Sequence, residues 1–396
     1  MSTSLLVRLA NIFVVGYAAD AVVSLIALVV GEATLVLLLQ RSLASLVYLG
    51  AFVCIPMLAF CARLPAPLLL TLCMSVFWLA SGGAPLPLAF DPDTTLPAVL
   101  ALFQSAFALA ALLRIRQLNR GRGWLIGDET RPGPAFSFAH TVRFLATLVF
   151  IVAPLFLGYV LISVGTWIEV GTERFIRVDL SGIQLSDRRY TRGEREIRLV
   201  GMMHLGEDAS YRDLAASFVA ENTVVLEEGV SDETGKFGRA ISYDRLARSL
   251  GLHAQRSFGD YLSSQPGDEE TTAWPVIRNA DVDAQAFSPE TLAYLELAAR
   301  IWDSDEPLAA FLELYRDTLE HPDRTKLLLH DVIELRNRQL IDEIERALPI
   351  YDRIIVPWGA LHLPEIEREM LARGFVLENE TRRQVIAWET LLHAIF

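Results

Sequence analysis

Two copies of the short motif Gly-x-x-His are the residues of this 396-residue chain whose types and spacing most directly suggest chemistry. The first copy runs from Gly201 to His204 in LVGMMHLGE, and the second from Gly359 to His362 in VPWGALHLPE. Each copy closes a short apolar run of the kind that forms a buried strand. Ligands of open α/β sheets bind where parallel strands end. We therefore expect the two imidazoles to meet at one edge of a sheet.

Acidic side chains end two further apolar runs. The run TVVLEEGV ends in Glu227 and Glu228, and the run PVIRNADVD ends in Asp281 and Asp283. The two glutamates compete for a single position at the strand end, and we favour Glu228, which precedes Gly229. Imidazole and carboxylate groups in one place can bind a divalent ion, and a carboxylate can also act as the base that deprotonates water.

Polar residues interrupt the buried face of a predicted helix over 331–347. Asn337 lies one helical turn from Ile333 and from Ile341, and Arg336 is its neighbour. A buried guanidinium is costly unless it meets a carboxylate or an anionic ligand. We expect either a site in which Arg336 stabilises an oxyanion and Asn337 holds the arrangement, or a structural ion pair that clamps this helix to the sheet.

These residues belong to a series of alternating strands and helices that begins near residue 168. The apolar runs at 196–203, 223–229, 275–283 and 353–362 are typical of buried strands, and helices are predicted at 210–220, 243–250, 331–347 and 364–373 and after the Ser-Pro pair at 288–289. Strand, helix, strand alternation indicates a parallel sheet. Residues 168–396 are therefore expected to form an α/β domain, with a mixed sheet flanked by helices.

Residues 1–167 have a different composition, which indicates an α-helical membrane domain. They contain 9 Arg, no Lys and 6 acidic residues, in a chain whose hydrophobic fraction is 52%. About five apolar stretches approach the roughly 20 residues that cross a bilayer core; these are 10–39, 43–62, 66–82, 97–113 and 142–167. The three cysteines lie within these stretches, so the soluble domain has no thiol for a disulfide or a thiolate metal site.

Charge predicts how the chain lies in the membrane. Arginine is concentrated before the last apolar stretch, at Arg114, Arg116, Arg120, Arg122 and Arg131. Short loops with positive charge stay in the cytoplasm. Five crossings would then place residues 168–396 outside the cytoplasmic membrane, in a periplasm where the cell has one. This part holds 26 basic and 42 acidic residues, which disfavours a nucleic-acid partner.

The joint order of these features resembles the TraB/PrgY/GumN group, which includes the TIKI membrane metalloproteases and is distantly similar to erythromycin esterases and ChaN-type haem-binding proteins. The matching features cover a little under half the chain and are Gly201-x-x-His204, LEEGV, LGLHAQ around Gln255, NADVD, Arg336-Asn337 and Gly359-x-x-His362. The resemblance implies an erythromycin-esterase/ChaN-like α/β fold with both histidines and a glutamate at one site. For TIKI-like members it implies metal-dependent hydrolysis of peptides or proteins.

The leading hypothesis is therefore a membrane-bound metallohydrolase that cleaves peptides or proteins at the outer face of the bilayer. The expected ligands of a manganese, zinc or cobalt ion are His204, His362, Glu228 and Asp281. The expected catalytic residues are Glu228, Glu227, Arg336 and Asn337. Three alternatives stay open: a metal-independent ester or lactone hydrolase that uses a histidine as base, a non-catalytic module that sequesters a peptide or signal, and purely structural histidines.

Overall fold

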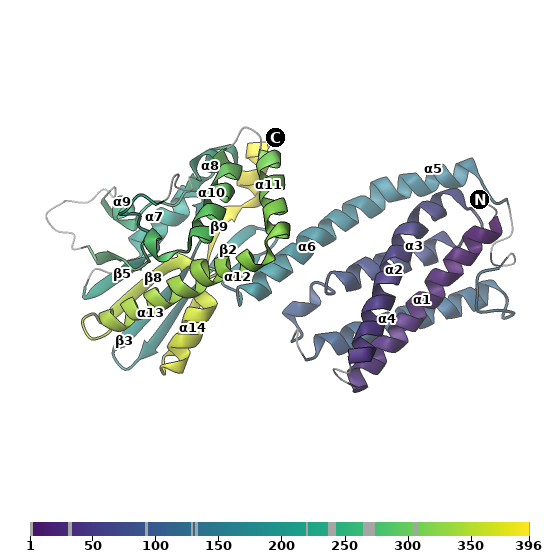
Figure 1. The fold of residues 1–396 in the computed structure, drawn as a ribbon, viewed down its shortest axis with the longest axis horizontal. Helices are drawn as coiled ribbons and strands as arrows, with labels where there is room; N and C mark the ends of the chain where they lie inside the picture. The colour runs from purple at the N-terminus through teal and green to yellow at the C-terminus, as the bar shows by residue number, and fades with distance from the viewer. Residues whose placement is uncertain are drawn as a thin grey trace. The chain divides into compact units, whose positions relative to one another are not determined.

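The chain folds into two compact units, Met1–Trp167 and Ile168–Phe396 (Figure 1). The structure is a computed structural model. It describes residues 3–30, 34–91, 94–127, 130, 134–218, 221–236, 243–263, 274–303 and 307–395. Arg131, one of the arginines used to predict orientation, lies outside these residues.

Unit 1 is built from apolar helices. They are α1 (Thr3–Val30), α2 (Thr34–Phe60), α3 (Ala66–Ala80), the short η1 (Leu86–Leu88), α4 (Leu96–Leu118) and α5 (Phe138–Thr147), which continues through a π-helical turn, η2 (Leu148–Val152), into α6 (Ala153–Gly171). Within the described residues, four helical stretches are long and apolar enough to cross a membrane, whereas five were expected. The difference is α3, whose 15 residues measure about 22 Å against the roughly 30 Å of a hydrocarbon core.

The helix α3 is short because two glycines end it. Gly82 and Gly83 have φ angles of 80° and 67°, in the left-handed region that helices do not use. Helix α3 nevertheless runs in the same direction as α5 and α6. Before its start, the Ala62 amide donates to the Ala135 carbonyl just ahead of α5 (3.0 Å), and after its end the Trp167 indole donates to the Ser81 carbonyl (3.2 Å).

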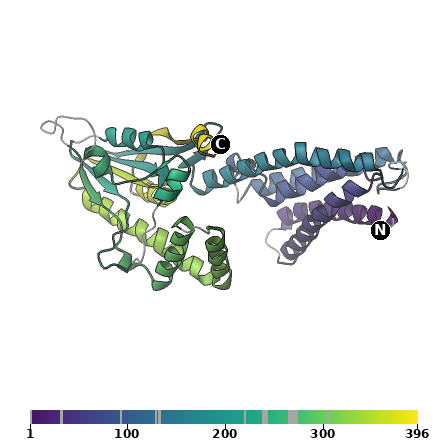
Figure 2. The ribbon, with the colours of Figure 1, turned by 90° about the horizontal axis from the view of Figure 1, so that it is seen from above.

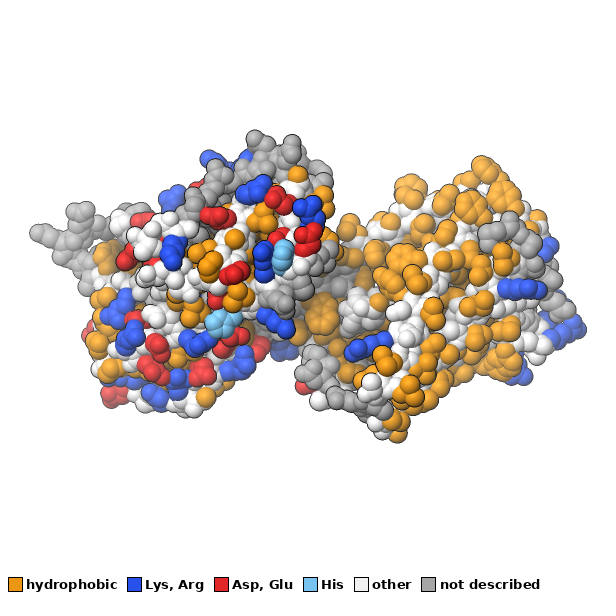
Figure 3. Space-filling model, in the orientation of Figure 1, with side chains coloured by type: hydrophobic (Ala, Val, Ile, Leu, Met, Phe, Trp, Pro, Cys, Tyr) orange, Lys and Arg blue, Asp and Glu red, His pale blue; other side chains and the backbone are white. Residues whose placement is uncertain are grey.

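The surface of unit 1 is largely apolar, as Figure 3 shows by its orange side chains. Ile12 is 67% exposed, Leu35 80% and Phe150 78%. Large apolar side chains at this density are unfavourable in water and favourable in hydrocarbon. The surface of unit 2 in the same view mixes acidic, basic and apolar groups. Unit 1 therefore has the surface of a membrane domain.

Unit 2 contains a seven-stranded mixed sheet. Its order is β1-β2-β3-β8-β5-β7. The strand β9 pairs with β2 along the edge opposite to the one that pairs with β1 and β3. The strands are β1 (Ile176–Val178), β2 (Gly182–Arg192), β3 (Arg195–Met202), β5 (Thr223–Glu227), β7 (Val276–Asn279), β8 (Arg353–Gly359) and β9 (Val376–Ala387). The strands β3, β8, β5 and β7 run parallel, whereas β1, β2 and β9 pair antiparallel. A separate pair is formed by β4 (Leu205–Gly206) and β6 (His253–Ala254).

Helices cover both faces of this sheet, so the predicted α/β domain with a mixed sheet is confirmed at this level. On one face α13 (Arg336–Ala347) and α14 (Leu363–Ala372) bury a core with Leu226, Leu340 and Val356. On the other face α7 (Asp208–Ala216) and α9 (Phe258–Ser263) bury a second core with Val225 and Ile355. Successive residues of one strand enter opposite cores because side chains alternate along a strand.

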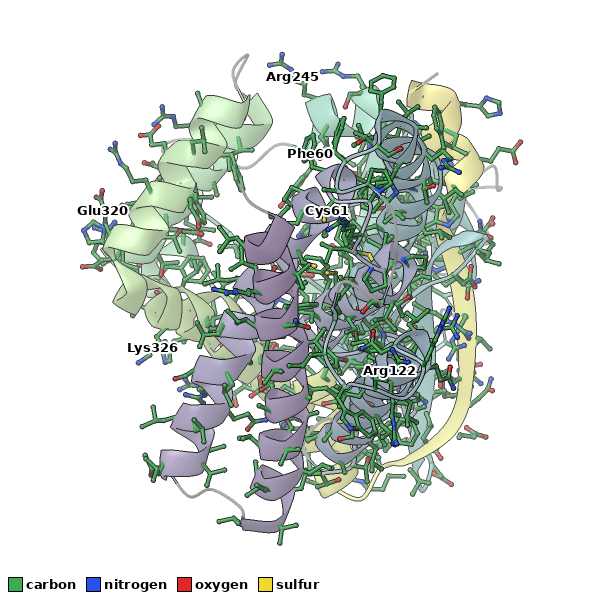
Figure 4. All side chains as sticks on the ribbon, turned by 90° about the vertical axis from the view of Figure 1, so that its right-hand side faces the viewer. Phe60, Cys61, Arg122, Arg245, Glu320 and Lys326 are labelled. Carbon is green, nitrogen blue, oxygen red and sulfur yellow. The ribbon has the colours of Figure 1, made fainter. Side chains whose placement is uncertain are left out.

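A group of helices stands off one side of the sheet in Figure 2. It comprises α10 (Pro289–Asp303), α11 (Pro307–Glu320) and α12 (Pro322–Leu329), and a short α8 (Asp244–Ser249), η3 (Ala284–Ala286) and the C-terminal α15 (Trp388–Ile395) complete the helices of unit 2. Ser288 caps α10 as predicted, since its hydroxyl accepts the Thr291 amide at 3.3 Å. Figure 4 shows Glu320 and Lys326 pointing outward from α11 and α12, and both are exposed.

Two features of unit 2 differ from the sequence prediction. The helix expected to begin at Asp331 is the last part of a continuous helical stretch that starts at Pro322 and passes through a π-helical turn, η4 (His330–Leu335). The strand β9 was not predicted, because its residues are mostly exposed along an edge of the sheet and its centre is polar.

Candidate functional site

Four parallel strands bring the residues singled out in the sequence to one edge of the sheet. Met202 at the end of β3 lies opposite Gly359 at the end of β8, and Glu227 at the end of β5 lies opposite Asn279 at the end of β7. The residues that follow these ends are His204, His362, Glu228 and Asp281. The carboxyl ends of the parallel strands thus form the edge at which ligands of such sheets bind.

The guanidinium of Arg336 lies at the centre of this edge. It is 8% exposed and begins α13, directly after the π-helical turn η4. Its Nε and Nη2 donate to the two oxygens of Asp281 (2.9 and 2.6 Å), and Nη2 also donates to Glu228 Oε1 (2.7 Å). The bidentate pairing fixes the plane of the guanidinium. The costly burial of this cation is therefore offset by two carboxylates, which hold the pKa of Arg336 above its usual value despite burial.

His362 is buried behind Arg336 and holds a defined tautomer. Arg336 Nη1 lies 3.2 Å from His362 Nε2, and because arginine can only donate, Nε2 is the acceptor. His362 Nδ1 then carries the proton and donates to Asn337 Oδ1 at 2.7 Å. Asn337 in turn donates to Glu365 Oε2 at 2.5 Å. Burial, with the neighbouring guanidinium, lowers the pKa of His362 to about 4, so the ring is neutral.

Glu228 connects the guanidinium to the second glycine motif. Its Oε2 accepts the amide of Gly359 at 2.5 Å. A Cβ at Gly359 would lie 3.1 Å from this oxygen, so the glycine lets the carboxylate approach the backbone. Burial by itself would raise the pKa of Glu228, but Arg336, the two histidines and the Gly359 amide together hold it below its usual value. Glu228 is therefore held in its ionised form.

Glu227 has a different environment from its neighbour. Its carboxylate accepts the Phe258 amide at 2.5 Å and the Ser257 hydroxyl at 3.0 Å, and thereby caps the N-terminus of α9. Burial raises the pKa of Glu227 above its usual value. Both glutamates line the same cavity. The pair therefore contains one carboxyl that is held ionised and one that protonates more readily, as acid and base groups of an active site do.

His204 is exposed and faces this cavity, whose volume is ≈ 680 Å³. Its ring stacks on Tyr243 with centroids 4.9 Å apart and planes 12° from parallel. His362 is not among the cavity-lining residues, although Arg336 is. The two histidines therefore occupy unlike positions: His204 can meet a ligand, whereas His362 supports the guanidinium from behind.

Two of the four predicted metal ligands, Asp281 and His362, are engaged by other partners in this arrangement. Asp281 is fully buried and its two oxygens accept four hydrogen bonds, from Arg336, Gly229 and Val282. Those bonds use all the acceptor positions of a carboxylate. His362 Nε2 already accepts from Arg336. Over the residues that the structure describes, no three His, Cys, Asp or Glu side chains are grouped to hold a metal.

Other residues of the site gave weaker signals or none in the sequence. Tyr243, which stacks on His204, and Glu365, which orients Asn337, have no spacing that would single them out. Gln255, in the LGLHAQ segment, lines the cavity, and its buried Oε1 has no hydrogen-bond partner within the described residues. Asp283, the alternative to Asp281, instead caps η3 and binds Ser231 in a surface loop.

Comparison with known proteins gives no match: no family model, curated protein or solved structure matches this chain. The chemistry of the site must therefore be inferred from its own geometry.

Proposed function

We propose that unit 2 is a hydrolase that cleaves an ester or lactone with water, without a metal ion, in the cavity lined by His204, Glu228 and Arg336. One observation supports this proposal above the others. The guanidinium of Arg336 lies among Asp281, Glu228 and His362, where a metal-dependent enzyme would hold its ion. Four of its five N–H groups are engaged by these residues, and within the described residues the remaining Nη1 hydrogen has no acceptor, so we assign it to a substrate oxygen.

The reaction needs a base, an oxyanion donor and an acid. His204 takes a proton from water, and the water oxygen bonds to the substrate carbonyl carbon. The carbonyl oxygen becomes negative and accepts the free N–H of Arg336. When the tetrahedral intermediate collapses, the carbon–oxygen bond to the alcohol breaks and the alcohol takes a proton from Glu227. Solvent returns the proton from His204 to Glu227, and the products are a carboxylic acid and an alcohol.

Charge in the cavity restricts the substrate. The cavity is lined by three acidic side chains, Glu227, Glu228 and Asp232, and by two basic ones, Arg256 and Arg336. Aromatic and aliphatic side chains such as Phe287 and Leu295 form other parts of its wall. With Glu227 protonated, as the reaction requires, the two remaining carboxylates balance the two arginines, so the described lining carries no net charge. We therefore expect an uncharged acyl compound with an apolar body.

A metal-dependent peptidase is the second candidate. It is favoured by one observation: His204 and Glu228 face the same cavity, and within the described residues Glu228 accepts two hydrogen bonds, from Arg336 and Gly359. These two residues would hold manganese, zinc or cobalt, with the remaining positions filled by water or substrate. A non-catalytic module that binds a peptide or signal is the third. The three candidates differ in their response to chelation and in whether any bond is cleaved.

The test is hydrolysis by the full-length protein in neutral detergent. Substrates are a p-nitrophenyl ester, a lactone and a fluorogenic peptide set, each measured with and without a chelator. His204→Gln should lower kcat/KM about 10²- to 10⁴-fold, whereas His253→Gln, at an exposed histidine outside the cavity, should not. Ester cleavage that survives chelation supports the main proposal. Peptide cleavage lost on chelation supports the metallopeptidase instead, and binding without any cleavage overturns both.

We also propose that unit 2 is a distant member of the TraB/PrgY/GumN group, with an erythromycin-esterase/ChaN-like fold. Support comes from the two glycine-histidine motifs, which end the neighbouring parallel strands β3 and β8 one residue out of register, since Met202 lies opposite Gly359. Arg336 contacts Glu228 and His362, and Asn337 contacts His362, so these members of the resemblance share one site. A solved structure of unit 2 would test this relationship.

We further propose that unit 1 spans the cytoplasmic membrane and that unit 2 lies outside it, where its substrate and the lipid bilayer are its partners. The hydrogen bonds at both ends of α3 support five crossings, because they place its start and its end beside those of the long α5–α6 stretch. Leu180→Cys, at a fully exposed site of unit 2, should react with an impermeant maleimide in intact cells. Arg122→Cys, in the arginine-rich loop, should react only after permeabilisation, and the reverse pattern would refute this orientation.

A further inference from the structure

Unit 1 contains a large cavity of its own, between α1, α2, α3 and α4. Its volume is ≈ 1130 Å³. Small ligands bind in cavities of about 300–1,000 Å³, whereas a single ion needs far less space. Polar side chains line part of the wall, among them Tyr17, Asp20, Ser24, Gln40 and Gln104, and aliphatic side chains line the remainder. The size suits an organic molecule with a polar group and an apolar body.

Asp20 is the unusual residue of this cavity. It is 6% exposed, Oδ2 accepts from Gln104 at 2.7 Å, and Oδ1 is buried without a hydrogen-bond partner within the described residues. The neighbouring hydroxyls are already paired: Tyr17 with Ser75 at 2.9 Å, and Ser24 with Gln40 at 3.3 Å. An acid within a membrane segment is costly and commonly marks a ligand or ion pathway.

The charged groups that line this cavity indicate which ligand fits it. Asp20 is acidic, and no Lys or Arg is among the lining residues that the structure describes. A group with N–H donors and positive charge would satisfy Oδ1, and an ammonium does so best. A phosphate would find no cationic partner here, which disfavours zwitterionic phospholipids. The aliphatic wall would contact the remainder of such a molecule.

The cavity extends to one end of the helix bundle. Its lining includes Leu28 at the end of α1, Leu37 near the start of α2, Ala80 at the end of α3 and Leu96 at the start of α4. These four positions lie at the end where Trp167 donates to Ser81. A ligand would therefore enter from this face of the membrane and place its charged group deeper, at Asp20.

We propose that this cavity binds an amphiphilic amine that carries no phosphate, with its ammonium group on Asp20 Oδ1 and its alkyl chain against the aliphatic wall. This second site is independent of the hydrolase site in unit 2. The amine can come from the bilayer or from solution, since the recognised chemistry is the same.

The test is native mass spectrometry of full-length protein in neutral detergent, titrated with dodecylamine or with dodecanol as its uncharged counterpart. We expect dodecylamine to bind at a ratio of one and dodecanol at least tenfold more weakly. Asp20→Asn should weaken dodecylamine binding at least tenfold. Asp91→Asn, at an exposed carboxylate outside the cavity, should leave it unchanged.

A second variant tests amine binding in the cavity if Asp20→Asn does not fold. Ala80 is exposed and lines the cavity, so Ala80→Trp should narrow the entrance without disturbing the core, and should reduce dodecylamine occupancy. Unchanged occupancy in that variant, or equal binding of the amine and the alcohol, overturns the proposal. Displacement of dodecylamine by phosphatidylethanolamine at equal concentration would overturn the exclusion of phospholipids, whereas failure to displace it supports a phosphate-free amine.

Discussion

Acidification should destabilise unit 2 through His362. The unfolded chain binds a proton at this residue below pH 6.5, whereas in the folded protein the pKa of His362 is about 4 because of burial and Arg336. Protons therefore favour the unfolded state between these two values, and the stability present above pH 6.5 is lost progressively as the pH falls toward 4. At 1.36 kcal/mol per pKa unit the full loss is about 3 kcal/mol. About 2 kcal/mol of it falls between pH 7 and pH 5.

The assay is amide hydrogen exchange of the full-length protein in detergent, read from peptides that contain the core of β8. His362→Asn removes the titrating ring, and its amide can still donate to Asn337. The opening free energy of wild-type β8 should fall about 2 kcal/mol further than that of the variant between pH 7 and pH 5. Glu227 titrates in both proteins and cancels in the difference, and the pKa of Glu228 is held below this range.

His253→Asn supplies the matched control, because His253 is exposed and should keep the wild-type slope. If the opening free energy of β8 falls equally with pH in the wild type and in His362→Asn, the reasoning is refuted. That result would mean that His362 is protonated in the folded protein, and the Nε2 acceptor for Arg336 would then not exist.

Three further substitutions test the site. Gly359→Ala brings a Cβ to 3.1 Å from Glu228 Oε2, and this crowding should lower the free energy of unfolding, measured by chemical denaturation, by about 1–3 kcal/mol. Gly229→Ala, where a Cβ would have its nearest neighbour 3.8 Å away, should lower it less. Equal losses in the two variants would contradict the close approach of Glu228 to Gly359. Arg336→Met leaves two buried carboxylates without their cation and should lower the free energy of unfolding by about 3–5 kcal/mol in the same assay. Arg336→Lys should have an intermediate effect, because it keeps the charge but loses the bidentate geometry of the guanidinium. An unchanged free energy of unfolding in Arg336→Met would show that the ion cluster is not formed. Glu227→Gln keeps an oxygen to accept the Phe258 amide, so the melting temperature should change little, while ester turnover should fall about 100-fold if Glu227 is the acid; unchanged turnover would remove Glu227 from the mechanism.

The positions of the site residues could be predicted where strand periodicity governs them. The runs that became β3, β5 and β8 end in apolar residues because both faces of the sheet are covered there, so their ends were visible as the polar residues that follow. The burial of Asn337 was predictable for the same reason, since it interrupts an apolar helical face, and it is fully buried. Edge strand β9 was not predictable, because its exposed face carries charges that do not alternate with a buried set.

The chemistry was less predictable than the positions, because a metal site and a guanidinium site require the same partners. Carboxylates and neutral imidazoles at strand ends can surround either cation. In this structure Arg336 contacts Asp281, Glu228 and His362 together, and it directly follows the π-helical turn η4. Such turns are rare and are frequent at functional sites. No spacing of apolar residues indicates such a turn, so the sequence predicted Glu228, Asp281, Arg336 and His362 without showing that the guanidinium lies among the other three.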